Sequence, residues 1–513
     1  MSPFDIFANS HLSSLSITNL VLGYMGLIVI WLIATGFTGP LTRLPGPLWS
    51  KWTDLPVRYY LLKGDKAKFT HSLHETYGPV VRTGPKTVYI SDVATVRAIY
   101  AARSTSFLKD PSFYVGGNIR SVFSALDPRF HAQRRRILGP CFAEIALEDL
   151  QPTVMNRAQL CISQMGRDIK TRGYTDILHW WTLFAMDVIS EMCFGESFHM
   201  LEDGKKNQYA QDIAEMGALL PLRGAFPWLI WLGQHVPFFP WFKNVGITRQ
   251  RVVQYGQKHT SNYMKLVQSE DRVVKKTLFA SIIQKGGQGT TTTCGDGCGD
   301  QADRELLLTA QDVAAESQSY ITAGTDTTAI TMTYLVYAVV SNSQIQQRLL
   351  DELHTLPDNF TNRDLRELKF LNMLLDETLR LHGASQGGLP RVVPAGGANL
   401  AGHFIPGGCI VAAQNYSVHR DQDVFPEPEK FNPWRWENPS KEMMSAYMPF
   451  AIGPRNCIGL NLAKMELRLC TALFFRAFPS ARLSTKKGMS HEDMEKHVNF
   501  LVSPKGHRCL IEV

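Results

Sequence analysis

The sequence predicts a mainly α-helical fold with small β-sheets, built as one large domain behind a single transmembrane helix. Helical periodicities dominate from Ser121 to about Arg272, and further apolar helix patterns follow in the C-terminal half. Neither an internal repeat nor a second class of composition appears along the 513 residues. That length alone would suggest about three domains, but the uniformity favours one domain with a large core.

The N-terminal segment "ITNLVLGYMGLIVIWLIATGF", Ile17 to Phe37, carries no charge. A helix of about twenty apolar residues matches the ~30 Å hydrocarbon core of a bilayer. A signal peptide is the alternative, but its apolar region normally has only ~7–15 residues. Arg43 and Lys51 follow the segment and only Asp5 precedes it. The positive-inside rule therefore predicts an anchor with the rest of the protein in the cytosol.

A hinge separates this anchor from the rest of the chain. Pro40 and the stretch Pro45–Pro47 restrict the backbone there. We therefore expect residues 1–43 to form the membrane anchor and hinge, and residues 44–513 to form the folded domain.

The domain is expected to begin with short strands and to continue with long helices. Pro79–Asp92 alternates around a Gly-Pro turn, which is typical of two short strands. Thr309 can cap a long apolar helix, with Asp312 three residues later. About thirty residues at ~1.5 Å each would carry that helix across a whole domain. Leu365–Gly383 has the apolar spacing of one further helix that ends at its glycine.

Three segments depart from these patterns. Leu219–Phe242 is apolar and rich in Trp, Phe and Pro. Lys285–Gln301 is of low complexity, and we expect it to be a mobile surface loop. Val424–Trp436 is a proline-rich meander.

Charge and cysteine content exclude several classes of protein. The net charge of +7 contains no basic tract of the kind that binds nucleic acid. Nine cysteines form an odd, scattered set, which fits a reducing compartment better than a disulfide framework. Cys294 and Cys298 lack a second Cys or His pair at suitable spacing, so we expect no structural zinc site.

The stretch "FAIGPRNCIGLNLA", Phe450 to Ala463, surrounds Cys457 with glycines and Arg455 at the start of an amphipathic helix. Apolar residues at spacings of four and three predict that helix: Ile458, Leu462, Met465, Leu469 and Ala472. A helix N-terminus stabilises a thiolate, which soft metals prefer as a ligand. Glycines let backbone pass close to a flat ligand, and the arginine can meet a carboxylate on it. A buried structural thiol is the alternative, and the complete pattern argues against it.

At this point the chain resembles the haem-thiolate monooxygenases of the cytochrome P450 superfamily. Five residues match its haem-binding signature: Phe450, Gly453, Arg455, Cys457 and Gly459. The resemblance extends from about Leu44 onward and implies the single-domain fold of that family. It also implies that Cys457 is the axial ligand of the iron of haem b.

A second part of the resemblance is "ETLR" together with "FNPWRW". Glu377 and Arg380 lie one helical turn apart, a spacing that more often belongs to solvated surface salt bridges. The resemblance implies that both form a buried ionic triad with Arg435, which holds the cysteine loop in register. These three residues are assigned structural support and no chemistry.

A third part is "AGTDTT", Ala323 to Thr328, in the middle of the long predicted helix. Threonines inside a helix commonly bond back to the carbonyl four residues earlier and bend the helix. Such a bend is expected to open the helix locally beside the iron. Splitting dioxygen consumes two protons, and a carboxylate–hydroxyl pair can relay them through water. We therefore assign Asp326 and Thr327 the role of proton relay.

A fourth part is "HAQRRRILGPCF". The family often has Trp four residues before Arg here, and both bind haem propionates. This chain has His131 in the tryptophan position and Arg135 four residues later. Histidine can still donate to a propionate, and Arg391 in "LPRVVPAGG" is a further candidate. A basic helix on a solvated face is the alternative.

Electrons must come from outside, since the chain holds no dinucleotide fingerprint and no flavin module. The resemblance implies a separate NADPH-dependent cytochrome P450 reductase in the same membrane, the endoplasmic reticulum. Its docking face should be cationic, with contributions from Arg134, Lys464 and Arg468. Ordinary solubility charges are the alternative for these three residues.

The substrate is expected to be lipophilic. Leu219–Phe242 fits the flexible lid of the family, with a packed core stretch as the alternative. Ser319–Ala323 and Gly388–Val393 are expected to line the pocket. The stretches "LPRVVPAGG" and "FNPWRWENPS" resemble those of biosynthetic members of the family from filamentous fungi, which suggests a terpenoid or polyketide substrate. A haem-thiolate isomerase or dehydratase and a non-catalytic haem sensor remain as alternative functions.

Overall fold

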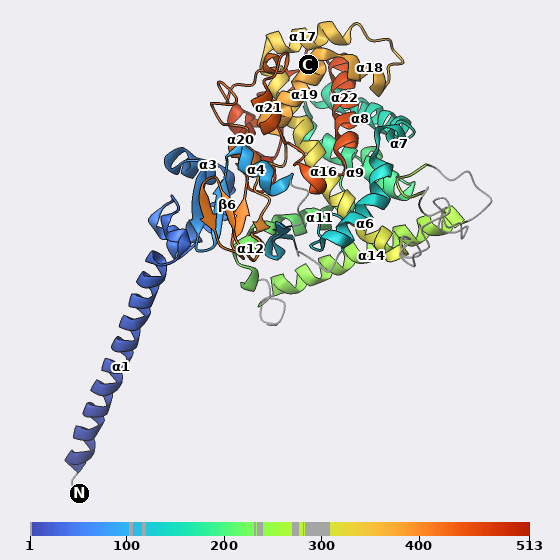
Figure 1. The fold of residues 1–513 in the computed structure, drawn as a ribbon. Coiled ribbons are helices and arrows are strands. Elements are labelled where there is room, and N and C mark those ends of the chain that lie inside the picture. The colour runs from blue at the N-terminus through green and yellow to red at the C-terminus, as the bar shows by residue number, and fades with distance from the viewer. Residues whose placement is uncertain are drawn as a thin grey trace, which may run out of the picture.

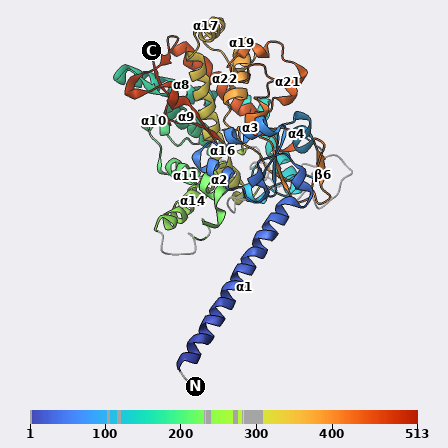
Figure 2. The same cartoon turned by 90° about the vertical axis from the view of Figure 1, so that its left-hand side faces the viewer.

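The computed structural model describes residues 3–101, 106–114, 120–229, 232, 240–268, 276–280, 282 and 308–513. The body is mainly helical, as predicted, and one long helix leaves it (Figure 1). Both views place the C-terminus on the far side of the body from the N-terminus (Figures 1 and 2).

That protruding helix is α1 (Pro3–Phe37). Its apolar part, Thr18–Phe37, has a mean hydropathy of 2.2 and is only 6% buried against the rest of the chain. Among the described residues it is the one helix long and apolar enough to cross a membrane. The short helices η1 (Pro40–Arg43) and η2 (Leu48–Lys51) then lead into the body.

Helix α16 (Ala310–Val340) runs through the middle of the helical body (Figure 1). Thr309 and Asp312 form the predicted capping box at its start. Around it pack α9 (Ile177–Phe194), α19 (Lys369–His382) and α22 (Leu460–Ala477). Fully buried apolar side chains on these helices form the larger core, and burial of each contributes about 1.5–3 kcal/mol.

Further helices surround this centre. They are α2 (Leu55–Lys63), α3 (Lys66–Tyr77), α4 (Val93–Tyr100), α5 (Pro111–Tyr114), α6 (Pro128–Leu138), α7 (Glu144–Glu148), α8 (Gln151–Arg172), α10 (Met200–Asp203), α11 (Gln208–Ala218), α12 (Leu220–Ala225), α14 (Pro240–Gln268), α17 (Ser343–Leu353), α18 (Asn362–Glu367), α20 (Asn415–Val418) and α21 (Lys441–Ala446).

A five-stranded sheet with the order β1-β2-β8-β5-β3 lies beside the C-terminal end of α1, where this helix meets the body (Figure 1). The predicted hairpin is confirmed, because β1 (Val80–Gly84) pairs antiparallel with β2 (Thr87–Ile90). The other strands are β3 (Leu108–Lys109), β5 (Arg391–Val392) and β8 (Ile410–Ala412). A second, smaller core packs against this sheet.

The remaining strands form small sheets at the edges of the body. A three-stranded sheet has the order β4-β12-β9, and two further pairs are β6-β7 and β10-β11. Their bounds are β4 (Thr175–Asp176), β6 (Ala398–Leu400), β7 (His403–Ile405), β9 (Arg482–Leu483), β10 (Lys496–Val498), β11 (Val502–Pro504) and β12 (Leu510–Glu512).

Two predicted helix boundaries were wrong. Leu365–Gly383 is two helices, because Leu368 adopts extended backbone angles (φ −75°, ψ 106°) between α18 and α19. The last helix begins at Leu460 with Gly459 as its N-cap, so Cys457 lies in the loop before it. The predicted loop Lys285–Gln301, with Cys294 and Cys298, lies outside the described residues.

Candidate active site around Cys457

The loop that carries Cys457 is held by backbone contacts. The Cys457 N–H donates to the carbonyl of Phe450 at 2.9 Å. Gly453 has a φ of +75°, and a Cβ there would lie 2.1 Å from the carbonyl oxygen of Tyr100. The backbone of the protein itself therefore requires this glycine, which sequence reasoning had related to a ligand.

Cys457 is exposed in this loop, unlike the other described cysteines, which are buried or half-buried. Protein atoms crowd the sulfur, and this burial raises the pKa of the thiol, while the Gly459 N–H and the charge of Arg135 act in the opposite direction. The Gly459 N–H acts in the direction expected for a helix N-terminus, but burial outweighs it, and the helix itself begins three residues later. A cationic metal centre bound to the sulfur would supply the missing stabilisation of the thiolate.

Basic side chains from three separate segments converge near this loop. Arg455 donates to the carbonyl of Ala125 at 2.7 Å, and Arg135 donates to the carbonyl and side chain of Asn456, both at 2.7 Å. Arg391 donates to the hydroxyl of Tyr114 at 2.7 Å. The predicted site residues on α6, β5 and the cysteine loop are thus brought together.

Lys109 on β3 joins this cluster and was not predicted from sequence. Its ammonium donates to the carbonyl of Phe123 at 2.5 Å, and the side chain is buried. Burial, reinforced by the charges of Arg455 and Arg391, lowers the pKa of Lys109 to about 6. Its only signal in the sequence is a single lysine between Leu108 and Asp110, which does not distinguish it from a surface charge.

His131 is buried within the same cluster. Burial, with Arg455, Lys109, Arg135 and Arg391 adding repulsion, lowers the pKa of His131 to about 3. Burial, then the charge of Arg391, lowers the pKa of Arg455 to about 10. The lowered pKa values of His131 and Arg455 both indicate an excess of positive charge in this part of the molecule.

The cluster fits an anionic ligand. Within the described residues none of these cations forms a salt bridge, and their partners are carbonyls, a hydroxyl and an amide. Buried charge is costly unless an opposite charge pairs with it. Two carboxylates next to an accessible thiol would compensate this charge, so the donor set matches a haem with its propionates.

Glu377 is the centre of the predicted ionic triad. Its carboxylate accepts from Arg380 at 2.8 and 2.9 Å and from Arg435 at 3.0 Å. The N–H of Asn432 and the indole N–H of Trp436 donate to it as well, both at 2.9 Å. Glu377 and Arg380 are fully buried, so the surface alternative does not apply.

A bonded path leads from this triad toward the cysteine loop. Arg380 donates to the carbonyl of His419 at 2.7 Å. The ring of His419 accepts from the N–H of Met448 at 3.1 Å, two residues before Phe450. The triad therefore supports the start of the loop through His419.

The predicted relay lies on one accessible stripe of α16. Thr322, Ala323 and Asp326 are exposed and Thr327 is half-buried, whereas Thr325 and Thr328 are buried. The Thr327 hydroxyl donates to the carbonyl of Ala323 at 2.7 Å, as predicted. The helix continues without interruption through this stretch, so the expected local opening of its backbone is not seen.

Asp326 has an unusual environment. Surrounding protein atoms desolvate its carboxyl group and raise its pKa, and the charge of Lys206 partly opposes this shift. A carboxyl group with a raised pKa exchanges protons closer to neutral pH than an ordinary one.

Thr328, the next residue, connects α16 to α22. Its hydroxyl donates at 3.0 Å to Glu466, which is nine residues after Cys457 and buried. Burial raises the pKa of Glu466 to about 8. This acid is therefore held neutral at the junction of the relay helix and the helix that follows the cysteine loop.

Glu466→Gln is expected to remove a pH dependence of stability. The pKa is about 8 in the fold against 4.5 in the unfolded chain. The neutral form of Glu466 therefore stabilises the fold, and this contribution is fully present below pH 4.5. It is lost as the pH rises from 4.5 to about 8, by up to ~1.4 kcal/mol per pH unit. The unfolding midpoint of E466Q relative to wild type should rise between pH 5 and 8.

The exposed Glu437 provides the control for this change. E437Q should follow the wild-type curve at every pH. Parallel curves for E466Q and wild type would show that Glu466 is ionised in the fold and would contradict the prediction.

The three cations predicted for a partner surface differ in their surroundings. Arg134 forms an ion pair with Asp312 and is mostly buried. Lys464 lies 3.7 Å from Asp376, and Arg468 donates to Asn372 at 2.9 Å. Arg134 and Lys464 are therefore both paired with a carboxylate, but Lys464 is the more exposed of the two and Arg468 bonds only a neutral amide. Lys464 and Arg468 on α22 are thus the stronger candidates.

Comparison with known proteins adds independent information. The family model Cytochrome P450 matches residues 44–511. Cytochrome P450 monooxygenase tazI of Aspergillus terreus is 41% identical, over 97% of this chain and 99% of that protein. Cytochrome P450 monooxygenase orf2 of Aspergillus niger is 37% identical over 93% of each chain. Cytochrome P450 monooxygenase cypX of Dothistroma septosporum is 30% identical, over 94% of this chain and 92% of that protein.

Proposed function

Because this chain belongs to the cytochrome P450 family and is a P450 monooxygenase, we propose that it inserts one atom of dioxygen into a lipophilic fungal secondary metabolite. A terpenoid or polyketide is the proposed substrate class. The observation that carries the proposal is the exposed Cys457 beside a cluster of largely buried basic side chains that have no carboxylate partner among the described residues.

Haem, when bound, supplies the iron at which dioxygen is reduced and split. Cys457 would hold it through Sγ, and Arg455, Arg391, Arg135, His131 and Lys109 would pair with its propionates. The buried positions of Arg391 and Lys109 orient these donors in advance, which lowers the entropic cost of binding. Phe450, Gly453 and Gly459 would shape the loop around the sulfur.

Asp326 and Thr327 would supply the protons. The Thr327 hydroxyl is oriented by the Ala323 carbonyl, and its oxygen remains free to accept from water. Asp326 lies next to it, and its raised pKa means that it binds a proton more readily than an ordinary carboxylate does. Glu377, Arg380 and Arg435 would take no part in chemistry and would hold the loop.

We place the protein in the endoplasmic reticulum membrane, with α1 crossing once and the domain 44–513 in the cytosol. Exposed apolar side chains support contact of the body with lipid: Leu48, Leu55, Tyr59 and Trp228. Arg58 on α2 donates to the carbonyl of Ala225 at 2.6 Å, so the described start of Leu219–Phe242 lies against α2. This arrangement favours a lid next to the membrane over a packed core segment.

Two electrons per turnover would come from NADPH through a separate reductase. Lys464 and Arg468 on α22 would contribute to its docking face. Both follow Cys457 on the same helix, which gives a short distance between the docking face and the haem site.

The proposed activity is tested with membranes that contain the full chain and the reductase. NADPH and a lipophilic fungal extract are added to them. We expect oxygen uptake that depends on NADPH and products heavier by one oxygen atom. Thr327→Val should reduce product formation by about 10²-fold, because proton delivery by a positioned group contributes about that much. NADPH oxidation should continue and yield hydrogen peroxide in place of product.

Thr333→Val is the matched control, since the Thr333 hydroxyl on α16 makes the same kind of bond, to the carbonyl of Ala329 at 2.7 Å, but is buried in the core away from the predicted relay. It should keep product formation and NADPH oxidation coupled. Product without NADPH would indicate an isomerase or dehydratase, and haem binding without oxygen uptake would indicate a sensor; either outcome contradicts the proposal.

A further inference from the structure

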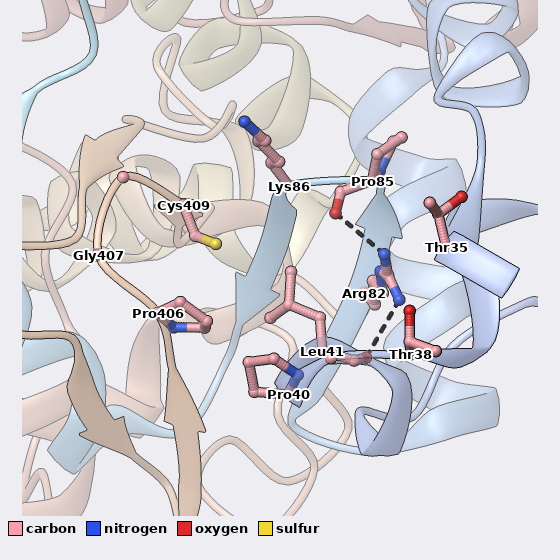
Figure 3. Close-up of a pocket in the computed structure, with 12 residues that line it drawn as sticks. Thr35, Thr38, Pro40, Leu41, Arg82, Pro85, Lys86, Pro406, Gly407 and Cys409 are labelled. Carbon is pink, nitrogen blue, oxygen red and sulfur yellow. Dashed lines mark hydrogen bonds between the residues drawn. The ribbon is translucent and has the colours of Figure 1, made fainter. Parts of the chain in front are cut away.

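A cavity of about 320 Å³ lies where the membrane anchor joins the domain. The last turn of α1 and the helix η1 form one wall. The turn between β1 and β2 and the loop 406–409 before β8 form the other (Figure 3). This cavity is separate from the site around Cys457, and none of its lining residues belongs to that site.

Arg82 of β1 is the main charged group of this cavity. It is only 6% exposed, yet its guanidinium is bonded to carbonyls alone. The acceptors are Gly84 at 3.2 Å, Leu41 at 3.2 Å, Lys51 at 3.4 Å and Pro85 at 3.0 Å. These bonds use four of the five N–H groups of an arginine and neutralise none of its charge.

Lys86 adds a second positive charge to the wall. It is exposed. Burial raises the pKa of the nearby Cys409 thiol, and the charges of Lys86 and Arg82 partly oppose this shift. In Figure 3 the sulfur of Cys409 projects from the loop 406–409 toward the centre of the cavity. No acidic residue is among the described residues that line it.

The position of the cavity relative to a membrane follows from α1. Thr35, which lines the cavity, lies in the last turn of the apolar span Thr18–Phe37. Lys51 lies over the ring of Phe37 at 3.8 Å, so another cation is present at the same level. If α1 spans the bilayer, this level is where the phosphates of the cytosolic leaflet lie, and basic residues there attract anionic lipids.

We propose that this cavity binds the phosphate group of an anionic phospholipid. The phosphate would approach the unused N–H on Nη1 of Arg82 and the ammonium of Lys86, and the acyl chains would lie along α1. Such a lipid would link the anchor to the sheet and would fix the orientation of the domain on the membrane. This proposal is independent of the oxygenase chemistry.

The test measures lipid binding by native mass spectrometry on the detergent-solubilised, haem-loaded full chain, without NADPH or substrate. Short-chain phosphatidic acid, short-chain phosphatidylcholine and inorganic phosphate are compared. We expect one equivalent of phosphatidic acid to bind saturably and at least ten-fold more tightly than either of the others. Lys86→Glu should weaken that binding by at least ten-fold.

Lys441→Glu makes the same change of charge at an exposed position on α21 and should leave the affinity unchanged. Lys86 is exposed, so its variant should fold, whereas Arg82→Gln would also disturb the hinge through Leu41 and Lys51. Equal affinities for inorganic phosphate and phosphatidic acid would overturn the lipid assignment. Equal effects of K86E and K441E, or no saturable binding, would overturn the site.

Discussion

Cys457→Ala is expected to abolish haem binding and all monooxygenase activity. The alanine removes the exposed sulfur from a loop whose own charged side chain, Arg455, and whose bonded neighbour, Arg135, are guanidinium donors that cannot ligate iron. Loss of residues that merely orient a metal ligand costs about 10–100-fold in affinity or activity, so loss of the ligand itself should cost more. The measurement is the absorption spectrum of the reduced protein with carbon monoxide, together with the haem content of the purified chain.

Cys470→Ala is the control, since this thiol lies on α22, the helix that follows the cysteine loop, and is buried in the core. It should keep the full haem content and the same absorption maximum. An unaltered spectrum in C457A would show that another group ligates the iron, and the assignment of the site would then be wrong.

Glu377→Ala is expected to destabilise the domain by about 3–5 kcal/mol, because it leaves two guanidinium groups buried without their counter-charge. Arg380 is fully buried, and the side chain of Arg435 is only 7% exposed. The five hydrogen bonds that the carboxylate accepts would be lost together. The measurement is the midpoint of denaturant unfolding at constant haem content.

Lys505→Ala provides the comparison, since it removes one partner of an exposed pair with Glu495. Exposed pairs contribute about 0–1 kcal/mol, so this variant should unfold close to wild type. If E377A and K505A unfolded at the same denaturant concentration, the triad would have no supporting role. E377A should also lose haem faster than wild type, because the path through His419 to Met448 starts at Arg380.

Some features of this protein are determined by short stretches of sequence. The apolar helix up to Phe37, the capping box at Thr309 and the two strands within Pro79–Asp92 were predicted correctly, because each depends on residues within one helix or one turn. Glu377 and Arg380 are likewise neighbours on one helical turn, and a short pattern frames Cys457. Helix ends were less predictable, since Leu368 and Gly459 interrupt apolar patterns that continue across them.

Other features were decided only by the tertiary structure. Lys109 joins the cluster of Arg455 and Arg391 from strands and loops far apart in the chain, and Glu466 meets Thr328 across two helices. Arg82 is left without a counter-charge by the packing of the hinge on the sheet. The spacing of apolar residues and the neighbours in the sequence determine the local conformation of a residue. Its burial and the charges around it depend on which distant segments pack against it. That is why the sequence identified the cysteine and its helix, while the fold alone determined which charges are buried near it.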